Sequence, residues 1–594
     1  MINSARRFST IFLFALLAMF ALLCSLPVVA QDAEVPVKEI FLDNGMKLLM
    51  VERHESPTVT AGWVTHVGSV NEEVGATGIA HLFEHMMFKG SPTIGTSDYE
   101  KEAEIMAQLD ELRLEMEAEY EVMREAKRRG EIEGSIYLPE NQTELLAELR
   151  EKMKVLQDQQ KEFIIKDEIS QIYTEAGASG LNAGTGEDFT IYFITVPANK
   201  LELWFWMESE RLLNAVFREF YTERDVVREE RRMRTESDPV AKFEEQFNFM
   251  FWGSVPYHHP VVGWPSDVES ITRAQAQKFF ATYYAPNNIT VAMVGDFDSG
   301  EALTLAKKYF GRIPRGETPP PPVVTEEIEQ LAERRMIAFA DTNPSVQIRW
   351  HTVPFAHNDY FALDMVDAIL SDRTGRLYKS LVEAEQIATG EPYAAHSPYK
   401  YAGSLEIGAE LADGVDHQLV EQALLDEIER LKNEPVPERE LQKVKNQSLA
   451  DSYRRLQSNF YLWLQLLFYD VYDDWRFLNE STAKYAAVTA DEVQRVANTY
   501  FTDTGKNVLW YYRNEGSEED PELAALSGQA KAMAKQALAQ IAQVEDPAEL
   551  EQGLQQMQTM KSQAPPEFQP AIELIIKRAT ERIEKLRSAA GEEE

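Results

Sequence analysis

The stretch Gly78-Ile-Ala-His81-Leu-Phe-Glu84-His85-Met-Met-Phe-Lys-Gly90 places three polar side chains inside an otherwise apolar segment. On a helix, positions i and i+4 share one face, so His81 and His85 could reach one metal ion with Glu84 beside them. This supplies two metal ligands and a base that could activate a metal-bound water. The alternative is a partly buried helix with two satisfied histidines. Because burying these groups without partners would be costly, a bound cation is the better interpretation.

Composition limits the classes of protein that the chain can belong to. Its 594 residues are enough for several domains, and a hydrophobic share of 44% is typical of globular protein. The net charge of −39 disfavours a nucleic-acid role, because phosphate binding needs a basic surface. Cys24 is the only cysteine, so disulfides are excluded and a metal site must use histidines and carboxylates.

The N-terminus is typical of a secretory signal peptide. Arg6 and Arg7 precede an apolar run from Ile11 to Val29, and small residues favour cleavage after Ala30. We therefore expect residues 1–30 to be removed and the mature chain, which would lack cysteine, to be periplasmic or secreted. The alternative is an uncleaved membrane anchor.

Local patterns predict strands on either side of the His81 segment and a helical insertion after it. Asn44-Gly45 separates two apolar runs and predicts a β-hairpin, and Thr58 to Val67 is a further strand. Residues 99–170 are rich in Glu, Lys, Arg, Leu and Met at helical spacing. They predict two long helices joined by a short loop, with a solvent-exposed charged face.

The second half of the sequence repeats the first. Residues 271–284 and 488–501 align without a gap, and each stretch is a helix followed by a strand. This predicts a duplicated α+β unit, although unrelated amphipathic helices are the alternative. The Pro-rich residues 314–332 predict a stiff linker between the two units, and residues 516–594 predict a helical extension. Only the first unit has the cluster of histidine and glutamate, so we expect only that unit to be catalytic.

A charged helix is predicted over Thr222 to Arg231. Glu223 and Glu230 lie seven residues apart, so they share one face of this helix. A helix with two inward carboxylates could complete a metal site, whereas the alternative is a solvated charged helix.

At this point the sequence resembles the pitrilysin (insulinase-like) metallopeptidases, which include the mitochondrial processing peptidase and its bacterial relatives. The resemblance rests on the stretch from Gly78 to Gly90, on Leu181-Asn182-Ala183-Gly184-Thr185 and on the spacing of Glu223 and Glu230. The motif His81-Leu-Phe-Glu84-His85 is the inverzincin signature. The resemblance covers most of residues 36–515 but does not explain residues 99–170 or 516–594.

The resemblance implies an α+β fold with two homologous pitrilysin-like domains, each a mixed sheet with helices packed on one face. The implied domains are a catalytic domain at 31–313, with a helical hairpin inserted at about 99–170, a linker at 314–332, a non-catalytic domain at 333–515 and a helical extension at 516–594.

The resemblance also implies the roles of individual residues. His81, His85 and Glu230 would bind Zn²⁺, with the adjacent Glu229 as the competing third ligand. Two catalytic residues are implied, Glu84 as the general base and Glu223 as a carboxylate that orients a ligand. Asn182 and Ala183 would bind the substrate backbone as an added strand, or Asn182 is an ordinary residue of a strand edge.

Two features depart from the family. The 144 residues between His85 and Glu230 are roughly twice the usual separation, which the inserted hairpin explains if its ends lie close together. In addition, Val382 and Thr389 occupy the positions where the family carries a substrate-binding Arg and Tyr, and Tyr393 is out of register. We therefore expect a homodimer, or a heterodimer with a related subunit that supplies the Arg and Tyr.

The resulting function is a zinc metalloendopeptidase that hydrolyses short or unfolded peptides. The alternatives are a non-catalytic peptide-binding or assembly subunit of the same fold, and an assembly factor that uses its helical insertion and tail.

Overall fold

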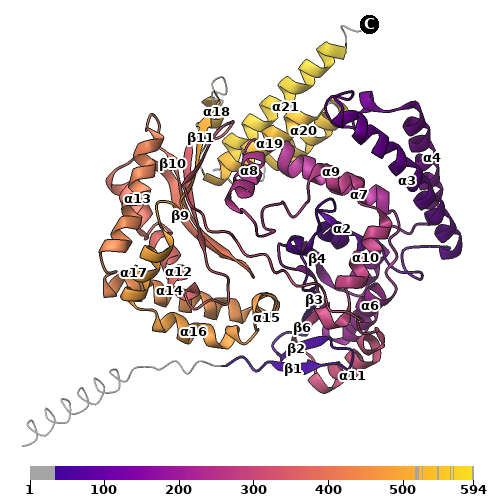
Figure 1. Cartoon of the computed structure of the whole chain (residues 1–594), viewed down its shortest axis with the longest axis horizontal. Helices are drawn as coiled ribbons and strands as arrows, with labels where there is room; N and C mark the ends of the chain where they lie inside the picture. Colours follow the sequence, from indigo (N-terminus) through magenta and orange to yellow (C-terminus); the bar gives the residue numbers. More distant parts are fainter. Residues whose placement is uncertain are drawn as a thin grey trace, which may run out of the picture. The chain divides into compact units, whose positions relative to one another are not determined.

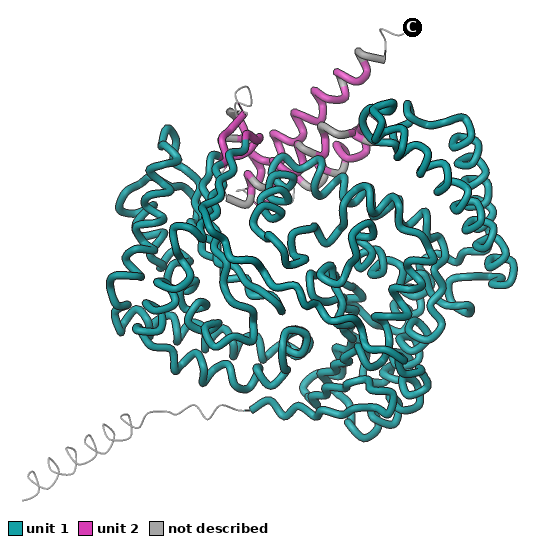
Figure 2. Tube along the Cα trace, viewed as in Figure 1, with its two compact units in different colours: residues 1–338, 344–510 teal, residues 339–343, 511–594 magenta. Residues whose placement is uncertain are grey.

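The computed structural model describes residues 34–514, 521–524, 526, 528–544, 547–561, 564–565 and 568–590. The chain forms two compact units, Met1–Ala338 with Pro344–Trp510, and Phe339–Asn343 with Tyr511–Glu594 (Figure 2). The expected signal peptide at residues 1–30 lies outside the described residues. No helix in the described ranges is both long and apolar enough to span a bilayer.

The first unit begins with a six-stranded sheet. Its strand order is β1-β2-β6-β3-β5-β4, and every pairing is antiparallel except that of β2 with β6. Gly45 adopts a left-handed φ of 91° in the turn between β1 and β2, which explains the Asn-Gly signal of the predicted hairpin. The strands are β1 (Lys38–Phe41), β2 (Lys47–Glu52), β3 (Thr58–Thr65), β4 (Ser179–Thr185), β5 (Thr190–Pro197) and β6 (Ile289–Gly295).

Both faces of this sheet are covered. Leu48 and Met50 of β2 pack into the core formed with helices α2 (Ile79–Met86), α6 (Leu201–Leu213), α10 (Arg273–Tyr283) and α11 (Ser299–Tyr309). Leu49 and Val51 point to the opposite face, because side chains alternate along a strand. There they pack against α15 (Asn459–Tyr472), whose Trp463 donates a hydrogen bond to the Ala292 carbonyl (2.9 Å). The helices of the first half of the chain therefore cover one face of this sheet, as expected, and α15 from the second half covers the other.

A second sheet in the other half of the chain repeats the topology of the first. Its order, β7-β11-β8-β10-β9, matches β2-β6-β3-β5-β4 strand for strand. Its core includes helices α12 (Tyr360–Leu370), α13 (His417–Asn433) and α17 (Ala490–Tyr500). The strands are β7 (Arg334–Ala340), β8 (Ser345–Thr352), β9 (Ala388–Pro398), β10 (Gly403–Leu411) and β11 (Asn507–Arg513).

The repeated helix is capped in the same way in both halves. Helix α10 starts with a capping box of Thr272 and Gln275, and α17 starts with one of Thr489 and Glu492. Each helix leads into an interior strand of its sheet, β6 or β11. The duplicated unit is thus visible in the topology as well as in the sequence.

The inserted segment is a pair of long helices, α3 (Tyr99–Arg128) and α4 (Glu144–Lys161), which lie side by side (Figure 1). Their connection runs from residue 129 to residue 143 and contains a short 3-10 turn at Pro139–Asn141. It is longer than the short loop that we expected, because Gly130, Gly134 and Pro139 act as successive interruptions rather than as one turn.

The remaining elements connect these parts. Residues 314–333 contain no helix or strand. In the second unit, helices α18 to α21 share a small core that includes Ala534, Ala571 and Ile575. The other helices are α5 (Glu168–Glu175), α7 (Phe220–Arg231), α8 (Ala241–Phe251), α9 (Pro265–Ser270), α14 (Glu438–Gln457), α16 (Phe477–Ala487), α18 (Pro521–Ala524), α19 (Gly528–Gln543), α20 (Pro547–Lys561) and α21 (Gln569–Ala590).

Candidate metal centre

Helix α2 presents His81, Glu84 and His85 because its apolar residues anchor the helix in the core. Leu82 and Phe83 are fully buried, so the helix cannot rotate without exposing them. Its N-terminus is held by Glu72, whose carboxylate accepts hydrogen bonds from the amides of Gly78 and Ala80, both at 2.8 Å. The orientation of the three polar side chains is therefore fixed by packing and capping.

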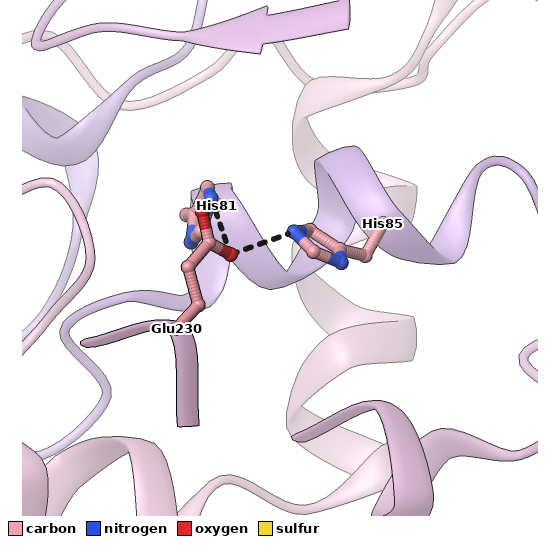
Figure 3. Close-up of side chains that lie close together, drawn as sticks. All are labelled: His81, His85 and Glu230. Carbon is pink, nitrogen blue, oxygen red and sulfur yellow. Dashed lines mark ion pairs between the residues drawn. The ribbon is translucent and has the colours of Figure 1, made fainter. Parts of the chain in front are cut away.

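Helix α7 brings Glu230 to the two histidines. Glu230 Oε2 lies 3.3 Å from His85 Nε2 and 3.7 Å from His81 Nε2, and Figure 3 shows both rings beside this one oxygen. Within the described residues, these three form the one group whose ligand atoms all lie within 4.8 Å of one another. The other oxygen, Glu230 Oε1, pairs with Arg234 at 2.6 Å. Helix α7 is followed directly by a π-helical turn at Arg232–Glu236.

The neighbouring Glu229 is directed elsewhere. Its side chain is half exposed and forms a bidentate ion pair with Arg232, at 2.6 and 3.0 Å. Adjacent helical residues point about 100° apart, so only one of the two glutamates can face the histidines. The structure places Glu230, and not Glu229, in that position.

Glu223 lies behind His85 and bonds the ring nitrogen that does not face Glu230. Its Oε1 accepts a hydrogen bond from His85 Nδ1 at 3.0 Å, and its Oε2 pairs with Lys89 at 2.5 Å. Burial alone would raise the pKa of Glu223, but the hydrogen bonds from His85 and Lys89 and the Lys89 charge lower it to about 2. An ionised carboxylate can only accept, so His85 Nδ1 carries a proton. Burial lowers the pKa of His85, but its hydrogen bond to Glu223 and the charges of Glu223, Glu230 and Glu84 raise it overall, so a metal ion that binds at Nε2 must displace a proton there.

These residues fit a zinc ion. Two ligands bound at about 2.0–2.1 Å with tetrahedral angles are about 3.3–3.4 Å apart, close to the separations of Glu230 Oε2 from the two imidazoles. Burial lowers the pKa of His81 to about 3, so its ring is neutral, as a ligand must be. Two imidazoles and one carboxylate are also a donor set that zinc accepts in catalytic sites, where a fourth position stays open.

Glu84 is on the same helix but outside the group of ligand atoms. Its Oε2 accepts a hydrogen bond from the Thr185 hydroxyl at 2.7 Å, and burial raises its pKa. Thr185 is the last residue of β4, and the sequence alone gives it no role. A base held beside a metal site with a raised pKa is suited to proton transfer.

Asn182 and Ala183 lie on β4, at the edge of the first sheet, and pair with Phe193 and Tyr192 of β5. The Asn182 side chain is exposed and accepts from the Ala183 amide at 2.9 Å. The structure therefore brings the edge strand next to α2 without fixing a role for Asn182.

The other predicted positions lie in the second half. Val382 is in a π-helical stretch at Tyr378–Ala384, and Thr389 is on β9. The Tyr393 hydroxyl donates to Glu406 at 2.6 Å.

Sequence reasoning missed four residues that support the centre: Glu72, Lys89, Thr185 and Arg234. The i, i+4 spacing of Glu230 and Arg234 on a helix could have indicated their ion pair. Thr185 and Glu84 are 101 residues apart, so no local pattern connects them.

Two segments of the chain match models of known protein families. Residues 47–116 match the family described as insulinase (peptidase family M16), and residues 270–448 match the peptidase M16 inactive domain. The first match includes His81, Glu84 and His85, whereas Glu223 and Glu230 lie between the two matches. Their placement therefore rests on the geometry given above.

Individual relatives agree with these matches. The zinc protease PqqE of Helicobacter pylori is 25% identical over 486 residues, which cover 80% of this chain and 92% of that protein. A crystal structure of a protease from Helicobacter pylori has a TM-score of 0.65 at 22% identity, covering 80% of this chain and 99% of the other. The periplasmic protease PqqL of Escherichia coli has a TM-score of 0.60 at 18% identity, covering 84% of this chain but 49% of the other. These likenesses confirm the predicted fold of two related α/β units, and the two family matches and the relative PqqE support the predicted resemblance to the insulinase (peptidase M16) family.

Proposed function

We propose that this protein is a zinc-dependent endopeptidase that hydrolyses short or unfolded peptides. The observation that carries the proposal is the convergence of His81 Nε2 and His85 Nε2 on Glu230 Oε2, with Glu84 on the same helix. The names of the relatives, which are zinc proteases, support it.

Each residue then has a stated task. His81, His85 and Glu230 hold the ion, and the chemistry that zinc supplies when bound is Lewis-acid activation of water and of a peptide carbonyl. Glu84 accepts the proton of the attacking water and passes that proton to the leaving amine, while the Thr185 hydroxyl holds its Oε2 in place. Glu223 keeps the proton of His85 on Nδ1, so that Nε2 remains a ligand.

The substrate would bind along β4. An edge strand offers unpaired backbone groups, and an extended peptide can add to it as a further strand. Asn182 and Ala183 lie on this strand beside α2, which would place the peptide backbone close to Glu84.

A second subunit would complete the substrate site. The proposal rests on Val382 and Thr389, which stand where the family carries an Arg and a Tyr. It also rests on PqqL, which is about twice as long as the part that this chain covers (49%). A homodimer or a heterodimer with a related subunit would supply these side chains. Native mass measurement after co-purification tests this, and full peptidase activity of an isolated monomer would contradict it.

We place the protein in the periplasm or outside the cell. The signal-like residues 1–30 and the periplasmic relative PqqL support this location. Sequencing the N-terminus of protein from a cell fractionation tests it, with Gln31 as the expected first residue.

The test of the activity is the variant Glu84→Gln. We expect it to retain zinc and to lose hydrolysis of a quenched fluorescent peptide by about 10²- to 10⁴-fold, the usual contribution of a general base. If the variant keeps its rate, Glu84 is not the base. If the wild-type protein holds no stoichiometric zinc and cleaves no peptide, the chain is instead a non-catalytic subunit of the same fold.

A further inference from the structure

Two buried arginines lie where the insertion packs against the catalytic unit, at the contact between helices α3, α7 and α9. We call this contact the three-helix joint. Arg113 of α3 is 1% exposed, and Arg224 of α7 is 5% exposed. Arginine stays charged at any ordinary pH, so both side chains hold a positive charge away from water. Each guanidinium therefore requires hydrogen-bond acceptors and a negative charge close to it.

The hydrogen bonds of these two guanidinium groups are incomplete. Arg113 uses one nitrogen, Nη2, which donates to Glu117 Oε2 at 3.1 Å and to the Glu269 carbonyl at 3.0 Å. Its Nε and Nη1 are buried and have no acceptor among the described residues, and the same is true of Nε and Nη1 of Arg224. Arg224 Nη2 is 3.9 Å from Glu269 Oε1, which is too far for a hydrogen bond. Four buried donor nitrogens are thus left without acceptors.

The charges of the three-helix joint do not balance either. Its one buried carboxylate in the described part of the chain is Glu269, whose Oε2 already accepts from Arg228 at 2.7 Å. Asp225 lies 3.7 Å from Arg224, but its side chain is more than half exposed. Burial and the charge of Arg224 lower the pKa of Arg113, so the two arginines repel one another. Two buried positive charges face one buried negative charge, and the joint is one negative charge short.

Tyrosine rings lie against both guanidinium groups. Arg113 is 5.3 Å from the centre of the Tyr120 ring, and Arg224 is 5.5 Å from that of Tyr221. Both tyrosines are buried. A ring face attracts a cation, but an ionised acceptor forms a much stronger bond with an N–H group. The rings therefore keep water away from the arginines without supplying the missing charge.

A cavity with a basic lining borders the three-helix joint. It has a volume of about 850 Å³, and it reaches Glu117, the carboxylate to which Arg113 donates. Its charged lining residues are three basic and two acidic ones, namely Arg124, Lys127, Arg128, Glu117 and Asp267. In a chain with a net charge of −39, a lining with more cations than anions is a local exception. Such a lining favours the entry of anions from solvent.

We propose that the three-helix joint binds a small monovalent anion of the chloride class between Arg113 and Arg224. One such ion supplies the missing charge and accepts hydrogen bonds from the unpaired nitrogens of both side chains. A buried water could accept the same bonds, but it would leave the charge uncompensated. The ion ties α3 to α7, so the insertion and the helix that carries Glu230 hold one another in place. The proposal is independent of the peptidase activity, because neither arginine is a metal ligand or the base.

The first test compares thermal unfolding of the zinc-loaded protein in sodium chloride and in sodium gluconate at equal ionic strength. Wild type should unfold about 2–4 °C higher in chloride, because a ligand that binds only the folded state stabilises it. Arg113→Met and Arg224→Met each remove one of the two charges and should lose most of this shift. Arg129→Met, at an exposed arginine that follows α3, is the matched control and should keep the shift. No chloride effect in wild type, or an equal effect in all four proteins, overturns the proposal.

The second test locates the ion directly in crystals of the wild-type protein soaked in bromide. Bromide replaces chloride and scatters anomalously, so we expect a peak in contact with the unpaired nitrogens of Arg113 and Arg224. Water at these atoms without a bromide peak overturns the proposal, as do peaks at surface arginines alone. This measurement decides the question even if the two methionine variants do not fold, because it needs no substitution.

Discussion

The outer carboxylate Glu223 gives a graded test of how the centre is built. We expect Glu223→Gln to weaken zinc binding moderately and Glu223→Ala to weaken it more. In both variants the direct contacts of His81, His85 and Glu230 are left in place. What changes is the acceptor at His85 Nδ1, 3.0 Å from Glu223 Oε1.

The magnitude follows from the contacts that are lost. A hydrogen bond to a charged group contributes about 1.5–3 kcal/mol, and loss of such an outer partner typically costs about 10- to 100-fold in metal affinity. Lys89 is not left unpaired, because Glu219 remains 3.3 Å away. We therefore expect the Kd for zinc to rise about tenfold in Glu223→Gln, which keeps an acceptor oxygen, and about 100-fold in Glu223→Ala.

The assay is competition with a chromogenic zinc chelator at neutral pH. Glu219→Gln is the matched control, because Glu219 also pairs with Lys89, whereas His85 Nδ1 donates to Glu223. Its Kd should stay within about twofold of wild type, the effect of a weakened outer ion pair. If Glu223→Ala binds zinc as tightly as wild type, or if Glu219→Gln loses as much affinity, the assigned role of Glu223 is wrong.

Three further predictions concern the base and the stability of the unit. Thr185→Val removes the hydrogen bond to Glu84, so kcat should fall about 10- to 100-fold at unchanged zinc content; an unchanged kcat would contradict this. Burial raises the pKa of Asp188 from 3.8 to about 6, so the folded protein holds this proton more tightly than the unfolded chain. The free energy of unfolding should therefore fall by up to about 3 kcal/mol as the pH rises from 4 through 6. Urea unfolding measures this fall, which should be missing in Asp188→Asn. Trp463→Ala should cost about 3–5 kcal/mol and speed hydrogen exchange in β6, whereas unchanged protection would show that α15 does not hold the sheet.

Local patterns were sufficient to predict much of the fold. The Asn44-Gly45 turn required a hairpin, and the spacing of His81, Glu84 and His85 required one helical face. The repeat of residues 271–284 at 488–501 predicted two related units, and the two strand orders now agree. In each case the signal lies within a few residues or in a direct repeat, where the chemistry of one turn or one helix decides the outcome.

Contacts between distant residues could not be predicted in this way. Glu229 and Glu230 have the same chemistry, and only the three-dimensional position of Arg232 and of the histidines separates them. Trp463 covers the first sheet and donates a hydrogen bond to Ala292, which is 171 residues away in the sequence. An apolar face along a strand shows that something must cover it, but the pattern does not say which helix does so.

Replacing each of two adjacent glutamates in turn tests most directly whether His81, His85 and Glu230 bind the zinc ion. The measurement is the amount of zinc bound per chain, by elemental analysis, in wild type, Glu230→Gln and Glu229→Gln. If His81, His85 and Glu230 form the centre, wild type and Glu229→Gln hold one zinc ion each, and Glu230→Gln loses its zinc during purification. Equal zinc content in the two variants, or loss in Glu229→Gln alone, would contradict the metal centre described above.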